Sequence, residues 1–302
     1  MRILITGCNG FIGKNLTDAF KKEHDIIGLG RAEISRADVR EYISCDIADR
    51  QRLSECIQKY SGSIDIVIHA AAEISDDVEK LYNTNCLGTQ NIADFAKTAG
   101  VSCFVYISSV PVIGIPQYVP ITEKHPVKPA TVYHYTKYFG EQIVQGLGAC
   151  GIRHGCLRIP SPVGYGMPDN KIFSVFVKRC LENQPLQIYG NGMRVQNYLD
   201  VRDLTCAVDR FIESDANGVY NIAGNSISDM ELAELCKEQL RSRSDISLLN
   251  NKTDIDSQRW IISPDAAGAD FGYKPQISIE DSILSVAVSY THLRAHETLR
   301  HL

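Results

Sequence analysis

Apolar runs and amphipathic segments alternate along the first 160 residues. Apolar runs at residues 3–5, 25–29, 64–68 and 101–107 have the length and composition of buried strands. Between them lie longer segments, such as 11–20 and 78–99, whose apolar residues recur at helical spacing. Strands that alternate with helices in this way predict an α/β fold with a Rossmann-type, doubly wound parallel sheet.

The pattern changes after residue 160. A loop at 160–166 leads into a helical segment, a short strand near residue 188, and further helices and strands up to residue 240. We predict a nucleotide-binding domain over residues 1–163, to which the chain returns at 197–224. Residues 164–196 and 225–288 are predicted to form a smaller C-terminal substrate lobe.

The last 14 residues, 289–302, differ in composition from the rest. They are rich in His and Arg, whereas the chain as a whole is acidic. The string resembles a translated sequencing adaptor, so we expect a non-native or disordered tail and exclude it from reasoning about the fold.

Composition and charge exclude several classes of protein. The 302 residues are 44% hydrophobic and carry 31 Lys and Arg against 36 Asp and Glu, a net charge of −5. We therefore expect no nucleic-acid partner, and no apolar run approaches the roughly 20 residues that span a bilayer. The first strand begins directly after Met1-Arg2, which favours a cytoplasmic protein without a signal peptide. None of the ten cysteines forms Cys-x-x-Cys, so free buried thiols are expected rather than a zinc site or a disulfide framework.

Three glycines, Gly7, Gly10 and Gly13, follow the first strand and lead into the first helix. Glycines allow a tight turn and a close approach of the backbone to phosphate, and the free N–H groups of a helix start favour an anion. The segment therefore predicts a dinucleotide cradle that includes Asn9, Phe11 and Ile12. A plain strand-turn-helix is the alternative.

The end of the second predicted strand bears on the choice between NAD and NADP. An NAD site usually places Asp or Glu there, to accept hydrogen bonds from the adenosine ribose. This chain has Gly30 and Arg31 instead, and a guanidinium can bind a 2′-phosphate. Arg31 favours NADP over NAD, unless it is only a solvated loop residue.

Tyr133 and Lys137 are four residues apart on a predicted helix and therefore share one face. A fixed ammonium favours the phenolate, so we expect Lys137 to lower the pKa of Tyr133 toward the range useful for acid–base catalysis. Ser109 lies at the end of the predicted strand that begins at residue 101 and can hydrogen-bond a reacting oxygen. The order of the three motifs, rather than the Tyr–Lys pair alone, indicates hydride transfer: glycine loop, Ser109, then Tyr-x-x-x-Lys.

In this order the motifs resemble the extended short-chain dehydrogenases/reductases of the NAD-dependent epimerase/dehydratase group, over residues 1 to 288. The resemblance implies that Tyr133, Lys137 and Ser109 are catalytic and that the substrate is a nucleotide sugar. It also implies further contacts to the cofactor, from Asp46, Ile47, Ala70, Ala71, Ala72, Asn85, Ser108 and Ile159.

Two departures from the family pattern narrow the activity. Family members that dehydrate sugars carry Asp-Glu directly after the catalytic hydroxyl residue, whereas this chain has Val110 and Pro111, so we expect no 4,6-dehydration. Many nucleotide-sugar enzymes carry Arg where this chain has Gln196, and Arg194 two residues earlier is a possible substitute. Ser109, Tyr133, Arg194 and Gln196 are the residues expected at the substrate.

The expected activity is therefore NAD(P)-dependent oxidation and reduction at a carbinol or keto carbon, by an epimerase or a ketoreductase. Reduction of a non-sugar ketone and a non-catalytic cofactor-sensing protein are the alternatives. By resemblance, we expect a homodimer in which the helices near 78–99 and 133–147 pair into a four-helix bundle. No metal ion is expected.

Overall fold

The computed structural model describes residues 1–249 and 257–300, with side chains through residue 292. Its main sheet has seven strands in the order β10-β6-β5-β4-β1-β2-β3, and each pair of neighbours is parallel. This order, with the chain crossing over at β1, is that of a doubly wound sheet, so the predicted fold class is confirmed. The strands are β1 (Arg2–Thr6), β2 (Asp25–Gly30), β3 (Glu41–Ser44), β4 (Ile66–His69), β5 (Cys103–Ser109), β6 (Arg153–Ile159) and β10 (Gly218–Asn221).

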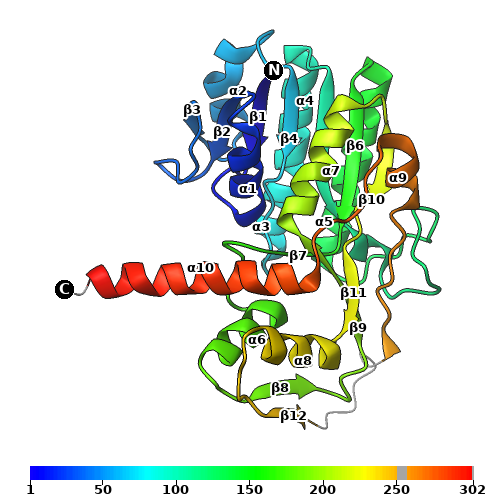
Figure 1. Ribbon diagram of the computed structural model, residues 1–302. Coiled ribbons are helices and arrows are strands. Elements are labelled where there is room, and N and C mark those ends of the chain that lie inside the picture. Colours follow the sequence, from blue (N-terminus) through cyan, green and yellow to red (C-terminus); the bar gives the residue numbers. More distant parts are fainter. Residues whose placement is uncertain (250–256, 301–302) are drawn as a thin grey trace.

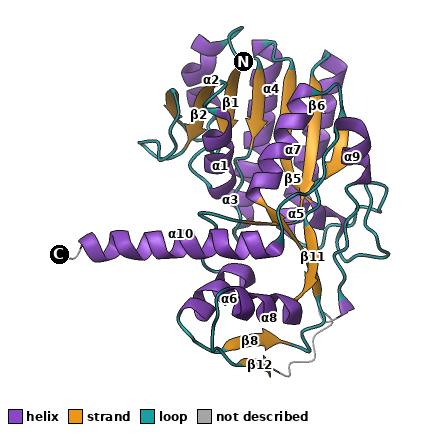
Figure 2. Ribbon diagram, viewed as in Figure 1, coloured by secondary structure: helices purple, strands orange, loops and turns teal. Residues whose placement is uncertain are grey.

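Helices cover both faces of this sheet (Figures 1 and 2). Along β1, Ile3 and Ile5 belong to one buried cluster and Leu4 to another, because successive side chains of a strand point to opposite faces. The first cluster is closed by α1 (Phe11–Phe20), α7 (Val201–Glu213) and α9 (Asp265–Phe271). The second is closed by α2 (Arg50–Ile57), α4 (Thr89–Ala99) and α5 (Val132–Gln145).

The helix predicted over residues 78–99 is present but is not uniform. It consists of α3 (Val78–Tyr82), a π-helical turn (Asn83–Gly88) and then α4. Such turns widen a helix locally and are frequent at functional sites. Short 3₁₀ turns lie at Gln58–Tyr60, Val110–Ile113 and Gly146–Cys150.

The second lobe lies beyond the carboxyl ends of the main strands, toward which the strand arrows point in Figure 2. It has its own buried cluster, which includes Phe173, Phe176, Leu232 and Ile283. Its elements are β7 (Ser161–Val163), α6 (Ile172–Leu181), β8 (Leu186–Tyr189), β9 (Val195–Asp200), β11 (Asn225–Ser228), α8 (Asp229–Gln239), β12 (Ile246–Leu249) and α10 (Ile279–Arg300).

One segment lies outside the lobe to which it was assigned. Residues 225–288 were predicted to belong to the substrate lobe, but α9 packs beside β10 on the main sheet, where Ala267 and Phe271 join the first buried cluster. Aromatic contacts of Phe271 with Phe211 and Tyr220 explain this placement. The other predicted domain boundaries stay a prediction.

The residues predicted to form a non-native or disordered tail, 289–302, begin within a helix. Helix α10 continues through residue 300 rather than ending near Val288 (Figure 1). The Ser289 hydroxyl is buried and accepts a hydrogen bond from the Gly166 N–H at 3.0 Å, and the Tyr290 hydroxyl donates to the Glu182 carboxylate at 2.5 Å. The prediction of a disordered tail from residue 289 is therefore wrong for these two residues.

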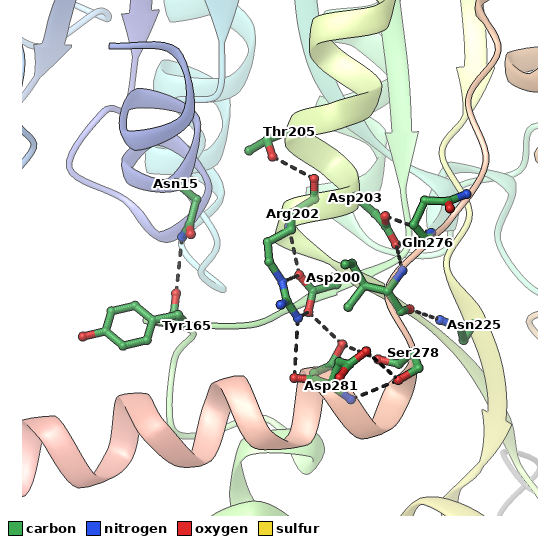
Figure 3. Close-up of polar contacts among 12 residues, drawn as sticks. Asn15, Tyr165, Asp200, Arg202, Asp203, Thr205, Asn225, Gln276, Ser278 and Asp281 are labelled. Carbon is green, nitrogen blue, oxygen red and sulfur yellow. Dashed lines mark hydrogen bonds and ion pairs between the residues drawn. The ribbon is translucent and has the colours of Figure 1, made fainter. Parts of the chain in front are cut away.

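Buried carboxylates at the start of α7 fix the start of α10 (Figure 3). The Asp203 carboxylate accepts the backbone N–H groups of Gln276 and Ile277, at 3.0 to 3.1 Å. The Asp200 carboxylate accepts the Ser282 hydroxyl at 2.7 Å and the Arg202 guanidinium at 2.8 and 2.9 Å. These contacts hold α10 beside the carboxyl edge of the main sheet, between the sheet and helices α6 and α8 (Figure 1).

All ten cysteines are free thiols, as predicted, and seven of them are buried. Over residues 1–249 and 257–292, no three side chains of the metal-ligating types gather into a possible metal site. In the same part of the chain, no helix combines the length and the apolar character needed to cross a bilayer.

Candidate cofactor and active site

Two positions of the glycine loop have no room for a side chain. Gly7 has φ +69°, in the left-handed region, and a Cβ there would lie 2.7 Å from the Ala71 Cα. A Cβ on Gly13 would lie 2.7 Å from the Gly7 carbonyl carbon and 2.8 Å from the Cys8 Cα. The loop after β1, the start of α1 and the chain after β4 thus touch through their backbones.

The N-terminus of α1 is open to an anion. Gly10 is its N-cap, and no side chain within the described ranges caps it. The first backbone N–H groups of a helix have no intrahelical partner, and Phe11 and Ile12 occupy this first turn. Uncapped N–H groups and a close glycine backbone are the features that accommodate a phosphate.

A cavity of about 310 Å³ lies at this point, where β1, β2, β3 and β4 end. Nine of the residues predicted to contact a cofactor line it: Gly7, Asn9, Gly10, Arg31, Asp46, Ile47, Ala70, Ala71 and Ala72. Sequence reasoning missed Leu29, Ala32, Cys45 and Thr84, which also line it. The first three flank predicted residues at strand ends, whereas the position of Thr84 depends on the π-helical turn, for which the sequence offers no signal.

Asn9 contributes to the cavity wall by ordering a loop. Its carboxamide oxygen accepts the backbone N–H groups of Arg36 at 2.6 Å and Ala37 at 3.2 Å, and its amide donates to the Tyr42 hydroxyl at 3.1 Å. These bonds hold the segment after β2 against the glycine loop. The side chain that the sequence suggested as a ligand contact is therefore already engaged within the protein.

Arg31 lies at the cavity and is exposed, with 59% of its side chain accessible. Its Nη2 is 3.2 Å from an oxygen of the Glu73 carboxylate, in the chain after β4. Exposed ion pairs contribute little free energy, about 0–1 kcal/mol. The guanidinium can therefore exchange this carboxylate for another anion at low cost.

The last residue of β4, His69, is a core residue. Its Nδ1 is 2.6 Å from the Thr6 hydroxyl and its Nε2 is 3.0 Å from the Thr89 hydroxyl, which in turn donates to the Asn85 carbonyl. Because the Thr89 proton is used in this way, we assign the imidazole proton to Nε2. Burial lowers the pKa of His69 to about 3, so the ring is neutral and serves to join β1, β4 and α4.

Asn85 connects the chain beside the cavity to α5 by hydrogen bonds. Its carboxamide accepts the Glu73 N–H at 2.8 Å and donates to the Glu73 carbonyl at 3.0 Å and to the Thr136 hydroxyl at 3.0 Å. Thr136 directly precedes Lys137, so this single side chain links the chain after β4 to the predicted catalytic helix. Within the described residues its contacts are to the protein, although the sequence suggested a cofactor contact.

Helix α5 places Tyr133 and Lys137 one turn apart. Lys137 is 3% exposed, and its Nζ lies 4.1 Å from the centroid of the buried Tyr106 ring. Ser109 ends β5, where the register pairs it with Ile159, the last residue of β6. These residues lie at the same edge of the sheet as the glycine loop but do not line the cavity described above.

The expected pKa shift of Tyr133 is wrong in direction. Burial raises its pKa to about 12, whereas the spacing to Lys137 had predicted a lower value. Burial also lowers the pKa of Lys137 to about 7. Loss of hydration acts on both groups against their charged forms.

Ser108 belongs to a buried hydrogen-bond network. Its hydroxyl donates to the Glu141 carboxylate at 2.6 Å, and that carboxylate also receives two hydrogen bonds from Arg158. Sequence reasoning assigned Ser108 to the cofactor and did not single out either charged partner.

The two residues expected at the substrate have different surroundings. Gln196 is 9% exposed and donates to the Tyr198 hydroxyl at 3.1 Å and to the Asp229 carboxylate at 3.2 Å. The Nε of Arg194 is buried and has no hydrogen-bond partner in the described part of the chain. Arg194 therefore retains a hydrogen-bond donor for a ligand, whereas the amide group of Gln196 already donates within the protein.

Residues 3–223 match the sequence model of the NAD dependent epimerase/dehydratase family. The chain belongs to this family. The predicted resemblance is thereby confirmed, together with an enzyme of the extended short-chain dehydrogenase/reductase type that depends on a nicotinamide cofactor.

Curated relatives in this family include sugar-nucleotide epimerases. The chain is 28% identical over 300 residues to a putative UDP-glucose 4-epimerase of Methanocaldococcus jannaschii, covering 94% of this chain and 96% of the relative. It is 30% identical over 235 residues to the UDP-glucose 4-epimerase of Mycolicibacterium smegmatis, covering 71% and 73%.

Solved structures support the fold. The UDP-glucose 4-epimerase of Thermotoga maritima, solved with UDP-glucose, superposes with a TM-score of 0.88 at 21% identity, covering 97% of this chain and 99% of that one. The UDP-glucuronic acid 4-epimerase of Bacillus cereus, solved with UDP-glucuronic acid and NAD, gives 0.84 at 23% identity, covering 97% and 100%.

Proposed function

We propose that this protein is a nucleotide-sugar 4-epimerase that uses a nicotinamide dinucleotide and acts on a UDP-hexose. The observation that carries the proposal is the bracing of the helix with Tyr133 and Lys137 against the glycine-lined cavity through Asn85. One continuous structure thus joins the glycine-lined cavity to the proposed acid–base pair. The names of the curated relatives support the UDP-hexose.

The residues of the cavity fit a nicotinamide dinucleotide. A Cβ on Gly7 or Gly13 would collide with backbone that lies against the loop, and the start of α1 offers uncapped N–H groups to a pyrophosphate. Asp46, Ile47 and Ala70–Ala72 line the cavity. We expect the first two to border the adenosine half, and the small alanines would allow a flat group to approach the backbone. When bound, the dinucleotide supplies reversible hydride transfer.

The protein's own part is proton transfer and orientation. In the proposal, Tyr133 takes the proton of the sugar hydroxyl during oxidation and returns a proton during reduction. Ser109 donates a hydrogen bond to the same oxygen. The Lys137 ammonium stabilises the phenolate, and a bound nicotinamide cation would act in the same direction on the pKa of Tyr133.

Elimination of water is not part of the proposed reaction. A 4,6-dehydratase needs an acid and a base beside the reacting sugar, and Val110 and Pro111 follow Ser109 instead. Val110 is fully buried, and neither side chain can carry a proton. We expect no 4-keto-6-deoxy product from a nucleotide hexose.

We propose that Arg31 makes the protein prefer NADP(H). The guanidinium lies at the cavity, and no carboxylate stands at the end of β2 to repel a 2′-phosphate. Its exposed pair with Glu73 would have to exchange for the phosphate, at small cost. Cofactor preference is decided by calorimetric titration with NAD⁺ and NADP⁺; tighter binding of NAD⁺ would contradict the proposal.

We also propose a homodimer formed through α3 and α5. Several large apolar side chains on these helices and on the π-helical turn are 40–59% exposed: Val78, Tyr82, Leu87, Val132, Tyr135 and Phe139. Exposed apolar side chains that gather on adjacent helices are typical of an association surface. A second copy pairing the same helices about a two-fold axis would cover them.

The activity is tested with the purified protein and a panel of UDP-hexoses. An epimerase interconverts UDP-glucose and UDP-galactose, or another C4 pair, without net consumption of cofactor, and chromatography of the products shows this. A ketoreductase would instead consume NADPH in proportion to product. Absence of conversion of every UDP-hexose in both assays would refute the proposed function.

A further inference from the structure

A buried carboxylate lies one helical turn beyond Lys137. Glu141 is completely buried on α5, four residues after Lys137. Its carboxylate receives the Arg158 Nε at 2.9 Å and Nη2 at 2.8 Å, and the Ser108 hydroxyl at 2.6 Å. Ser108 and Arg158 are direct partners in the register of β5 and β6, so this one side chain fixes α5 to two neighbouring strands.

Stability is a weak explanation for this network. Removing two charges from water costs about as much as their attraction returns, and apolar side chains of the same size often stabilise as well. The network is also incomplete, because the Arg158 Nη1 is buried without a hydrogen-bond partner among the described residues. A buried ion pair in this position therefore calls for a second role.

The surroundings of Lys137 indicate that role. The groups that face it from neighbouring elements are His69 on β4, Tyr106 on β5, Cys86 on the π-helical turn and Cys156 on β6, with Tyr133 and Glu141 on its own helix. Burial lowers the pKa of His69 and raises that of Tyr106, Tyr133 and both cysteines, so these five are uncharged near neutral pH. Glu141 is the anion of the set.

We propose that Glu141 is a positioning residue of the active site, whose buried carboxylate keeps Lys137 in its ammonium form and fixes the end of β5 that carries Ser109. The inference rests on the proposed function, because Lys137 and Ser109 act in it. The sign follows from electrostatics. A negative charge favours the ammonium and so opposes the effect of burial; with both effects present, the pKa of Lys137 is lowered to about 7.

The test removes the negative charge of Glu141 and keeps the size and shape of its side chain. Glu141→Gln removes the negative charge, and Glu141→Gln combined with Arg158→Met removes both charges, so that no unpaired cation stays buried. Asp203→Asn is the matched control: it removes a carboxylate of similar burial, 2% exposed, that lies in α7 and accepts the backbone N–H groups of Gln276 and Ile277. All variants are made in the full chain.

The readout is the titration of Lys137 itself, followed by NMR in protein labelled with ¹³C at the lysine Cε, with the signal assigned by its loss in Lys137→Arg. We expect a midpoint near pH 7 in the unmodified protein. Glu141→Gln should lower it by about one pH unit or more, the range for loss of one nearby opposite charge. The midpoint of the double variant should also be lower than that of the unmodified protein, and Asp203→Asn should leave the midpoint unchanged.

An unchanged midpoint in Glu141→Gln would overturn the inference. Should that variant fail to fold, the double variant decides, and a midpoint equal to that of the unmodified protein would overturn it likewise. If the protein is active, kcat/KM should fall as pH rises and Lys137 loses its proton. In Glu141→Gln this fall should occur at lower pH, by the same amount as the shift of the NMR midpoint. If no UDP-hexose is converted, the proposed function fails, while the NMR titration still decides the role of Glu141.

Discussion

Replacement of Gly13 by Ala tests the glycine cradle by the addition of one methyl group. The new Cβ would clash with the Gly7 carbonyl oxygen and would lie 2.7 Å from the Gly7 carbonyl carbon, about 0.7 Å closer than the 3.4 Å at which ordinary contact begins. Gly7 has little room to retreat, because an atom one bond beyond its Cα, at the Cβ position, would lie 2.7 Å from the Ala71 Cα. The strain must therefore move the loop that the pyrophosphate is proposed to contact.

Two effects determine the size of the result. Ala is favoured over Gly within a helix by about 1 kcal/mol, and Gly13 lies in α1. Overpacking of a tight site costs about 1–3 kcal/mol, so the net loss of stability should be about 0–2 kcal/mol. Loss of one hydrogen bond to a charged phosphate costs about 1.5–3 kcal/mol, which corresponds to a 10- to 100-fold weaker affinity for the dinucleotide.

Gly146→Ala is the matched control. Gly146 follows α5 with φ −61°, and a Cβ there would meet no other atom within 4 Å. This control should bind dinucleotide normally and be more stable by about 0.4–1 kcal/mol. Affinity is measured by calorimetry with NAD⁺ and NADP⁺, and stability by urea unfolding. Unmodified affinity in Gly13→Ala would refute the placement of the pyrophosphate at this loop.

Four further changes test the other parts of the proposal. Tyr133→Phe should lower turnover by about 10²–10⁴-fold and leave dinucleotide affinity unchanged; turnover within a few-fold of the unmodified protein would assign the proton transfer to another group. Arg31→Asp should shift preference in calorimetry from NADP⁺ to NAD⁺, because a carboxylate repels the 2′-phosphate. Phe139→Glu should convert the proposed dimer to a monomer in light scattering at micromolar concentration, and a monomeric unmodified protein would refute the dimer. Truncation after Val288 should lower the melting temperature by a few degrees, because the contacts of Ser289 and Tyr290 are lost; an unchanged melting temperature would show that these contacts do not stabilise the fold.

Much of the fold could be predicted because the decisive signals are local. The apolar runs of β1, β2, β4 and β5 and the helices between them follow from periodicity, and parallel strands necessarily bring their carboxyl ends to one edge. That rule is sufficient to gather Gly7, Arg31, Asp46 and Ala70 around one cavity. The sequence does not indicate where a helix ends against solvent, and for this reason the continuation of α10 past the change in composition could not be predicted.

Hydrogen-bond partners could not be predicted in the same way. Asn9, Asn85 and Ser108 were selected by residue type and motif position, and the structure places each at the predicted edge. Their partners, however, come from segments 12 to 51 residues away in the chain, such as Glu73 and Thr136 for Asn85 and the α5 carboxylate for Ser108. Local spacing carries no information about such contacts, so residues that brace the site were taken for residues that touch its ligand.

The pKa of Tyr133 illustrates the same limit in electrostatic terms. A spacing of four residues on a helix correctly makes Lys137 its neighbour, and in water that proximity would favour the phenolate. The effect of the ammonium depends, however, on whether the lysine remains charged once α5 is packed against β5 and β6. Burial lowers the pKa of Lys137 to about 7, although the Glu141 carboxylate raises it, and burial raises the pKa of Tyr133 to about 12. Glu141 lies one turn further along the same face of α5, and its charge is held in place by Arg158, a residue of β6 that no spacing rule connects to Tyr133.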